Sequence, residues 1–351
     1  MNIKESLKRI NLKTLKIVVL GIAGFTILVG GGYMLYSWNR PLDPALELPD
    51  LTLDPSQESM ETEENGTLQP TVDPVCGGPP SMTVLISGVA SDNYLYGLAD
   101  AIRVARIDFQ TQKVTVLAFP RDLWVEIPGL ESRGITVGKL NQAYFYGTEG
   151  MGYYDGSGFG SGLLAETLFN NYGLVSSHYL SVNLYSFRVI INTLGGIDLT
   201  LAENVYKRVN DQPVLYLKAG PHHLNGKQAE MLARQRISIG DFGRINHQTL
   251  ILQAVAAKLL SPSGITAVPA LVEQLKSNVE TDFSPAEITQ LTCLAGMIDF
   301  QDDVTYVTLP ESDLEEQMMY DPARGINTAA LVGDPEIISS LLADFQTGIW
   351  P

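Results

Sequence analysis

The sequence has little of the chemistry that binds zinc or nucleic acid. Its 351 residues include two cysteines and four histidines, with no CxxC pair and no histidine spacing typical of a zinc site. Basic residues are also few, because 23 Lys and Arg stand against 39 Asp and Glu, a formal net charge of −16. Nucleic acids and anionic lipid head groups select basic surfaces, so we expect neither nucleic acid as a partner nor broad contact with such head groups. An anionic substrate must therefore be held by a local basic pocket.

One long uncharged run lies near the N-terminus. Residues 17–38 contain no charged side chain, and five basic residues precede them. A helix of this length can span a bilayer, and the positive-inside rule places residues 1–16 in the cytoplasm and the rest outside. A cleaved signal peptide is the alternative, but its apolar core is usually roughly 7–15 residues long and no small-x-small cleavage site follows here. We therefore expect a cytoplasmic tail at 1–16 and a single-pass transmembrane anchor at 17–38.

Residues 39–80 are interpreted as an acidic, proline-rich tether. Large apolar residues are scarce there, so the segment cannot bury a core. It would hold the following domain, residues 81–351, close to the membrane without fixing its orientation. Cys76 lies at the end of the tether and Cys293 in a helical stretch of the domain. Outside the cytoplasm the two could form a disulfide, which we favour; the alternative is two buried or free thiols.

Short apolar runs alternate with helical stretches, which predicts an α/β domain with a central mixed β-sheet flanked by helices. Strands are expected at residues 82–88, 101–108, 113–119, 124–127, 178–183, 197–201 and 304–309. Helices are expected at 163–171, 184–194, 226–234, 244–260 and 285–297, and after Asp334. The helix at 285–297 follows a capping box that begins at Ser284. Residues 147–162, rich in glycine and tyrosine, are expected to form a loop.

Three arginines and one aspartate lie between residues 234 and 244, in the sequence RQRISIGDFGR. In so acidic a chain this cluster suggests a specific role, because the guanidinium fork matches phosphate oxygens in a bidentate way. Gly243 and Arg244 are expected to begin a helix, whose free N–H groups also attract anions. The segment therefore predicts a phosphate or pyrophosphate site. Surface ion pairs with the many acidic residues are the alternative, because such pairs are common.

Further motifs occur in a fixed order along the domain. They are FPRD at 119–122, KLNQAY at 139–144, LGGI at 194–197, LNGKQA at 224–229, RQR at 234–236, DFGR at 241–244 and Gln248. Together with the anchor, this pattern resembles the LytR-CpsA-Psr (LCP) family of bacterial cell-wall phosphotransferases, over residues 81–260. The resemblance implies transfer of a phosphoglycosyl polymer from a polyprenyl-pyrophosphate lipid carrier to peptidoglycan, through a phosphodiester, outside the bacterial cell membrane. It also implies an apolar tunnel for the lipid tail between sheet and helices.

The resemblance implies a set of site residues. Those at catalytic positions are Arg121, Arg234, Arg236 and Asp241. Those at substrate-binding positions are Lys139, Arg244 and Gln248. The arginines would bind the pyrophosphate, and Asp241 would orient an arginine or help to activate the acceptor hydroxyl. Asp100 would lie beside a magnesium ion, which takes oxygen ligands and bridges phosphate oxygens.

Three positions depart from the family's pattern: Ala90 replaces a carboxylate, and Leu98 and His247 replace arginines. Asp92 could substitute for the missing carboxylate. Arg103 or Arg106 could substitute for the arginine missing at position 98, although strand alternation sends the two to opposite faces. The departures bear on metal dependence and on efficiency.

Two alternatives to the transferase stay open on the sequence. One is a pyrophosphatase acting on the same lipid, with water in place of the acceptor hydroxyl. The other is a non-catalytic module that binds or senses the carrier, and Ala90 and Leu98 favour it.

Overall fold

Six strands form the central sheet of the computed structural model, in the order β11-β6-β1-β2-β3-β12. Their bounds are β1 (Ser81–Val89), β2 (Ala99–Asp108), β3 (Lys113–Phe119), β6 (His178–Asn183), β11 (Val279–Thr281) and β12 (Val304–Thr308). β1 and β6 are parallel, as are β3 and β12, and the other neighbours are antiparallel. The predicted mixed sheet is therefore confirmed. Each of its strands except β11 was predicted to within two residues.

The structure describes residues 37–46, 48, 72–237, 239–261, 270, 271 and 278–350. The predicted cytoplasmic tail and nearly all of the predicted anchor at 17–38 lie outside these residues. Within the described part of the chain, no helix is long and apolar enough to cross a membrane.

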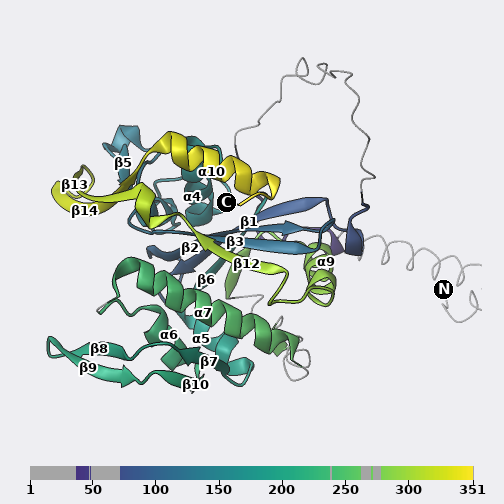
Figure 1. Ribbon diagram of the computed structural model, residues 1–351. Helices are drawn as coiled ribbons and strands as arrows, with labels where there is room; N and C mark the ends of the chain where they lie inside the picture. The colour runs from purple at the N-terminus through teal and green to yellow at the C-terminus, as the bar shows by residue number, and fades with distance from the viewer. Residues whose placement is uncertain are drawn as a thin grey trace, which may run out of the picture.

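Helices cover both faces of the sheet (Figure 1). On one face, α3 (Leu140–Gly147), α4 (Phe159–Tyr172) and α10 (Pro335–Thr347) enclose a core that includes Leu85 and Leu117. The neighbouring residues Val84 and Val116 point the other way and pack with Leu294 of α9 (Pro285–Ala295). This alternation is the period-2 pattern of a strand buried on both faces.

A second layer lies beyond that other face and carries part of the site. It consists of α5 (Leu184–Thr193), α6 (Gly226–Ala233) and α7 (Gly240–Leu260), with the short sheet of β7 (Ile197–Leu201) and β10 (Gly220–Leu224). These elements share a core of their own, and α7 passes between them and the central sheet (Figure 1). The loop from α6 to α7 therefore reaches the end of the central sheet.

Several elements were missed or misplaced by sequence reasoning. Missed were α3, β10 and three hairpins: β4–β5 (Trp124–Glu126 and Val137–Lys139, of which only β4 was expected), β8–β9 (Val205–Val209 and Gln212–Leu217) and β13–β14 (Leu314–Asp321 and Ile326–Gly333). The predicted loop at 147–162 is partly wrong, because α4 begins at Phe159. The predicted start of α7 at Arg244 is also wrong. The helix begins at Gly240, whose φ of +64° is a conformation that glycine adopts at little cost.

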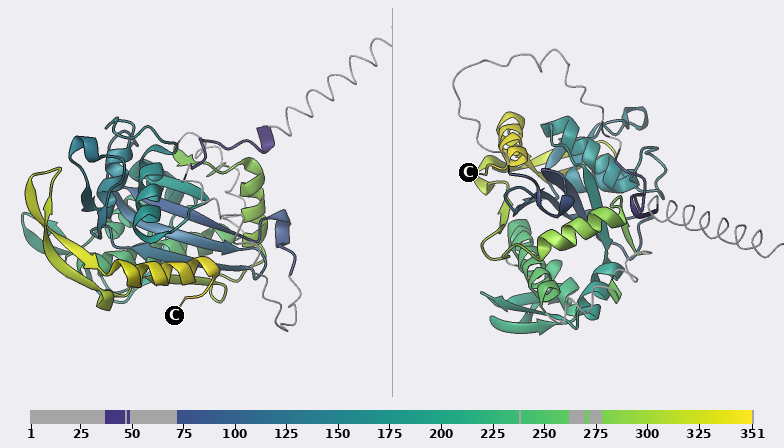
Figure 2. Two further views of the ribbon diagram at one scale, coloured as in Figure 1. Left: turned by 90° about the horizontal axis from the view of Figure 1, so that it is seen from above. Right: turned by 90° about the vertical axis from the view of Figure 1, so that its right-hand side faces the viewer.

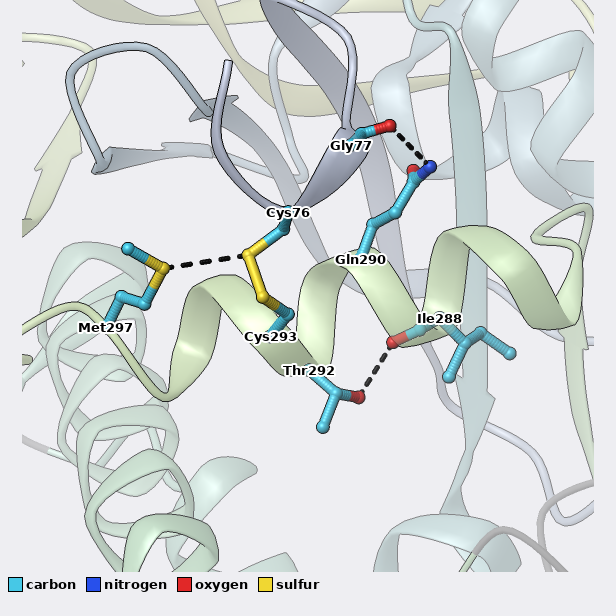
Figure 3. Close-up of a disulfide and its surroundings, with 7 residues drawn as sticks. All are labelled: Cys76, Gly77, Ile288, Gln290, Thr292, Cys293 and Met297. Atoms are coloured by element: carbon cyan, nitrogen blue, oxygen red, sulfur yellow. Dashed lines mark hydrogen bonds between the residues drawn. A yellow bond between two sulfur atoms is a disulfide. The ribbon is translucent and has the colours of Figure 1, made fainter. Parts of the chain in front are cut away.

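The predicted disulfide is present between Cys76 and Cys293, with 5.9 Å between the two Cα atoms (Figure 3). It joins the segment before β1 to α9. Beside it, Gln290 Nε2 donates a hydrogen bond to Gly77 O at 2.8 Å. The Val75 N–H donates to Phe109 O at 2.9 Å. The part of the expected tether just before the domain is thus fixed to the domain rather than free.

Glu280 in β11 gives the fold a pH dependence. Burial, with the nearby carboxylates of Asp43 and Glu149, raises its pKa from 4.5 to about 7. The folded state therefore holds this proton more tightly than the unfolded state. Its stabilising contribution is complete below about pH 4.5 and is lost as the pH rises through 7. Glu280→Gln should remove that loss, so the variant should be more stable than wild type at pH 8, by roughly 2–3 kcal/mol.

The measurement is urea unfolding of both proteins at pH 5 and pH 8. Because other groups also titrate, the quantity of interest is the difference between variant and wild type at each pH. Glu126→Gln, which changes an exposed carboxylate on β4, is the control and should follow wild type throughout. An equal difference at both pH values for Glu280→Gln would contradict the assignment.

Candidate active site

Residues of the predicted motifs meet at one end of the central sheet. Arg121 follows β3 directly after Pro120, and Asp100 lies at the start of the neighbouring β2. Arg121 and Lys139 line a cleft of about 540 Å³, together with residues of the loop between α6 and α7. The opposite wall is formed by the β13–β14 hairpin, which projects from this end of the molecule (Figure 2).

The backbone around Arg121 is fixed by the start of α3. The Leu140 N–H donates to Leu123 O at 2.7 Å, and the Asn141 N–H donates to Arg121 O at 3.1 Å. The first N–H groups of a helix have no partner within it, so these bonds satisfy two of them. From the other side, the Leu331 N–H donates to Asp122 O at 2.9 Å. The loop that carries Arg121 and Asp122 is therefore held between α3 and the β13–β14 hairpin.

Arg121 contacts three carboxylates. Its Nη1 lies 2.6 Å from Asp100 Oδ1, and its Nε lies 3.4 Å from Asp122 Oδ2 and 3.6 Å from Asp241 Oδ1. Burial alone would lower the pKa of Arg121, but Asp100 and the other carboxylates outweigh it and raise the pKa. Its Nε is buried and has no hydrogen-bond partner. The charge at this nitrogen is nonetheless met by Asp122 and Asp241, so the atom is buried beside carboxylates.

Asp241, in the first turn of α7, joins the arginines to one another. Its Oδ2 accepts a hydrogen bond from Arg244 Nη2 at 2.9 Å, while its Oδ1 lies 3.6 Å from Arg121 and 3.9 Å from Arg236. The Arg244 side chain is only 2% exposed, and burial lowers its pKa to about 10, so it stays charged at neutral pH. Like Arg121, it has a buried Nε without a hydrogen-bond partner. Both carboxylate oxygens of Asp241 are thus directed at guanidinium groups.

The two arginines of the RQR motif lie in different surroundings. Arg236 lines the cleft, with 42% of its side chain exposed, and its nearest carboxylate oxygens are 3.9 and 4.0 Å away. Arg234 is 55% exposed, pairs with Glu230 at 3.0 Å, and is not among the residues that line the cleft. Glu230 also pairs with Arg188. Only Arg236 therefore presents its donors to the cleft.

The site gathers positive charge in a chain that is acidic overall. Four cationic side chains belong to it: Arg121, Lys139, Arg236 and Arg244. Three carboxylates balance them in part: Asp100, Asp122 and Asp241. Glu311 and Glu316 also line the cleft, so the positive charge is concentrated around the arginines and does not extend over the whole cleft. Clustered guanidinium groups suit a group that carries several anionic oxygens.

Lys139 and Gln248 serve the cluster in different ways. Lys139 lines the cleft, and its Nζ lies 2.9 Å from Asp122 Oδ1. Gln248 donates to Ala233 O at 3.3 Å and to Asp100 O at 3.5 Å, so it joins α7 to α6 and β2. It is not among the lining residues, and its contact with a substrate stays a prediction.

The residues around Asp100 do not form a magnesium site by themselves. The Asp100 carboxylate is already paired with Arg121 and lies 4.0 Å from Arg236. Ala90 offers no carboxylate, and Asp92 pairs with Arg188 at 2.7 Å instead. In the described part of the chain, no three His, Cys, Asp or Glu side chains are grouped to hold a metal. A magnesium ion would need most of its oxygen ligands from elsewhere.

Neither candidate for the missing arginine lies in the cleft. Arg103 is 3% exposed and donates from Nη2 to Ile245 O and Thr249 Oγ1 of α7, at 3.1 and 3.0 Å. Arg106 lies on the opposite face and pairs with Asp108 at 2.9 Å. His247 does not restore a charge either, because burial lowers its pKa. Within the described chain, the substituted positions have no obvious replacement.

Sequence reasoning missed the acidic wall of the cleft. Glu311 and Glu316, beside and on β13, line it opposite the cationic residues, together with Leu314 and Ala330. No signal in the sequence pointed to these residues, because the hairpin itself lacks a clear apolar alternation and was not predicted.

Comparison with known proteins places this site in a family. The LytR_cpsA_psr family model matches residues 55–327, and the chain therefore belongs to this family. The match is wider than the 81–260 expected from the motifs and includes the β13 strand that walls the cleft.

Two Bacillus subtilis proteins are among the relatives, and both are named polyisoprenyl-teichoic acid–peptidoglycan teichoic acid transferases. TagV is 30% identical over 195 residues, which span 54% of this chain and 46% of TagV. TagU is 26% identical over 274 residues, which span 78% of this chain and 79% of TagU. The chain thus matches less than half of TagV by sequence. The crystal structure of TagV has a TM-score of 0.58 and 23% identity, covering 78% of this chain and 100% of that chain, so the fold is shared.

Proposed function

We propose that this protein is a phosphotransferase that moves a phosphoglycosyl polymer from a polyprenyl-pyrophosphate carrier to peptidoglycan during assembly of the bacterial cell wall. The cluster of Arg121, Arg236 and Arg244 around Asp241 carries the proposal, since it brings three guanidinium groups together beside the cleft. The names of TagV and TagU support the same reaction class. The carrier that the family resemblance implies is a polyprenyl pyrophosphate, and guanidinium groups match its anionic oxygens.

In the proposed reaction, the acceptor hydroxyl attacks the phosphorus that bears the sugar. A new phosphorus–oxygen bond forms, the bond to the polyprenyl phosphate breaks, and the hydroxyl proton is released. Negative charge develops on the leaving phosphate, and Arg121 and Arg236 lie where they can stabilise it. Asp241 orients these arginines, because both of its oxygens face guanidinium groups. The reaction needs no redox change.

The proposed location is the outer side of the bacterial cell membrane. The support is the uncharged run at 17–38 with five basic residues before it, which predicts a cytoplasmic N-terminus. A magnesium ion stays a separate proposal. It would draw on Asp100 and on oxygens of the substrate, and the reaction should therefore be measured with and without it.

The test is product analysis with the full-length chain in proteoliposomes. A polyprenyl-pyrophosphate oligosaccharide and peptidoglycan fragments are supplied, and products are identified by mass spectrometry. We expect a phosphodiester-linked product that is lost in the Arg121→Ala, Arg236→Ala double variant. Sugar phosphate without a linked product would instead indicate a hydrolase. Carrier binding with neither product would indicate a binding module and would contradict the transferase.

A further inference from the structure

The chain just after the expected anchor is attached to the edge of the central sheet. β11 is an outer strand of the sheet, so one of its edges is open to pairing. The Asp43 N–H donates to Thr281 O at 3.1 Å, and the Leu42 N–H donates to Phe283 O at 3.3 Å. In return, the Thr281 N–H donates to Asp43 Oδ2 at 2.9 Å. Residues 41–46, here called the strap, thus add to this edge in the manner of a docked peptide.

Apolar contacts hold the strap as well. Leu46 and Leu48 pack against the main hydrophobic core. Pro44 presents its carbonyl oxygen to the Tyr179 hydroxyl, which donates at 3.5 Å. By contrast, the side chains of Leu42 and Ala45 are exposed. The strap therefore has an attached side and a free side.

The strap enters at the end of the sheet that is remote from the cleft. Asn39, just before it, borders the same depression as Ser81 and Met82 at the start of β1. Asp100 of the site is the second residue of β2, which is antiparallel to β1. Ser81 at the start of β1 therefore pairs with Asp108, and Val89 at its end pairs with Ala99.

The two ends are thus separated by the nine residues of β1, or roughly 30 Å at about 3.3 Å per residue. Figure 2 shows the same layout, with the purple strap starting near α9 and the β13–β14 hairpin projecting from the opposite end.

A second attachment lies at the strap's end of the molecule. The disulfide between Cys76 and Cys293 fixes the chain before β1 to α9 (Figure 3). The depression that Asn39 borders also includes Gly77 and Gln290, beside that disulfide. The chain is therefore fixed to the domain both where it leaves the expected anchor and where it enters β1.

We infer that the strap is a positioning element. It holds the domain on its anchor so that the cleft stays about one sheet length from the membrane surface, in one orientation. The carrier's pyrophosphate then has to reach the cleft at that distance from the membrane surface. The inference rests on the proposed anchor and function. Without the strap, the first attachment after the expected anchor would be the disulfide at Cys76, so the domain would be held to the anchor less closely and could turn over.

The test compares two matched double variants of the full-length chain in proteoliposomes. Asp43→Pro with Leu46→Asp removes two hydrogen bonds and the partly buried leucine of the strap. Leu42→Asp with Ala45→Pro makes the same kinds of change on the free side. Hydrogen exchange at the Thr281 N–H checks that only the first variant releases the strap.

Orientation is measured by energy transfer from a fluorophore at Ala329, an exposed residue of the cleft wall, to acceptor-labelled lipids. We expect weak transfer in wild type and in the free-side variant, and at least about twofold more after release of the strap, because the freed domain samples the membrane surface. Equal transfer in all three proteins would overturn the inference. This readout does not depend on activity, so it stands even if the proposed function fails.

Activity gives a second, separate readout. On a carrier embedded in the same vesicles, the released variant should be at least about tenfold slower, because the cleft no longer meets its substrate in one orientation. On a short-chain, water-soluble carrier, it should stay within about twofold of wild type. An equal loss on both substrates would mean that the strap acts on the fold or on the site, and would contradict a positioning role. No activity of wild type on either substrate would instead count against the proposed function.

Discussion

Arg236→Ala is expected to lower kcat/KM by about 10²–10³-fold while leaving the melting temperature unchanged. The Arg236 side chain is 42% exposed in the cleft, and its nearest carboxylate oxygens are 3.9 and 4.0 Å away. It therefore contributes little to the folded state but offers a full set of donors to a developing negative charge. The kcat/KM of Arg236→Lys should lie between those of wild type and Arg236→Ala, because lysine keeps the charge but lacks the bidentate guanidinium fork.

Arg234→Ala is the matched control. Arg234 is also exposed, but it pairs with Glu230 and does not line the cleft. We expect a loss of less than about fivefold for this variant. The measurement is steady-state kinetics with the carrier and peptidoglycan fragments, beside thermal unfolding of each protein. An equal loss for the two alanine variants would mean that Arg234 turns into the cleft when the substrate binds.

This contrast shows where sequence reasoning reached its limit. The family resemblance assigned Arg121, Arg236, Arg244 and Asp241 to one site, and the structure brings the four side chains together. Their order along the chain could not separate Arg234 from Arg236, since the direction of each side chain is set by the turn between α6 and α7. Arg234 ends α6 and reaches back one turn to Glu230, as helical spacing allows.

The contacts of Asp100 also could not be predicted from the sequence. A carboxylate at this position was expected beside a metal, but here it forms the shortest ion pair of Arg121, at 2.6 Å. Ala90 explains this pairing, because it leaves Asp100 without a second carboxylate that could share a metal ion. A single carboxylate among several arginines pairs with a guanidinium group instead. Which group an acidic residue meets depends on tertiary distances that no local pattern contains.

The strands show the same division between local and distant information. β1, β2 and β3 are apolar runs bounded by turn residues, and their prediction was confirmed. β13 has the sequence LEEQMMYD, in which apolar and polar residues do not alternate, and it depends on its eight-residue pairing with β14. The cleft wall was therefore missed although the cationic side of the cleft was found. The disulfide could be favoured from the compartment, and Cys293 could be placed on a helix, but the proximity of the two cysteines required the fold.

Replacing Cys76 and Cys293 with serine should produce the largest loss of stability, about 3–5 kcal/mol in the free energy of unfolding. The disulfide closes a loop with a sequence separation of 217, so its removal greatly enlarges the unfolded ensemble. The measurement is denaturant unfolding of the full-length chain in detergent, for wild type, both single variants and the double variant. Each single variant should lose as much as the double variant, because each breaks the same bond.

Two controls separate this entropic effect from a general weakening of the fold. Reduction of wild type should lower its stability to that of the double variant and should leave the double variant unchanged. In the fraction that stays folded, kcat should be unchanged, because Cys76 lies just before the start of β1 and the cleft lies at the other end of that strand. A loss of kcat with little change in stability would mean that the attachment on α9 acts on the site. The disulfide would then belong to the catalytic arrangement rather than to the support of the fold.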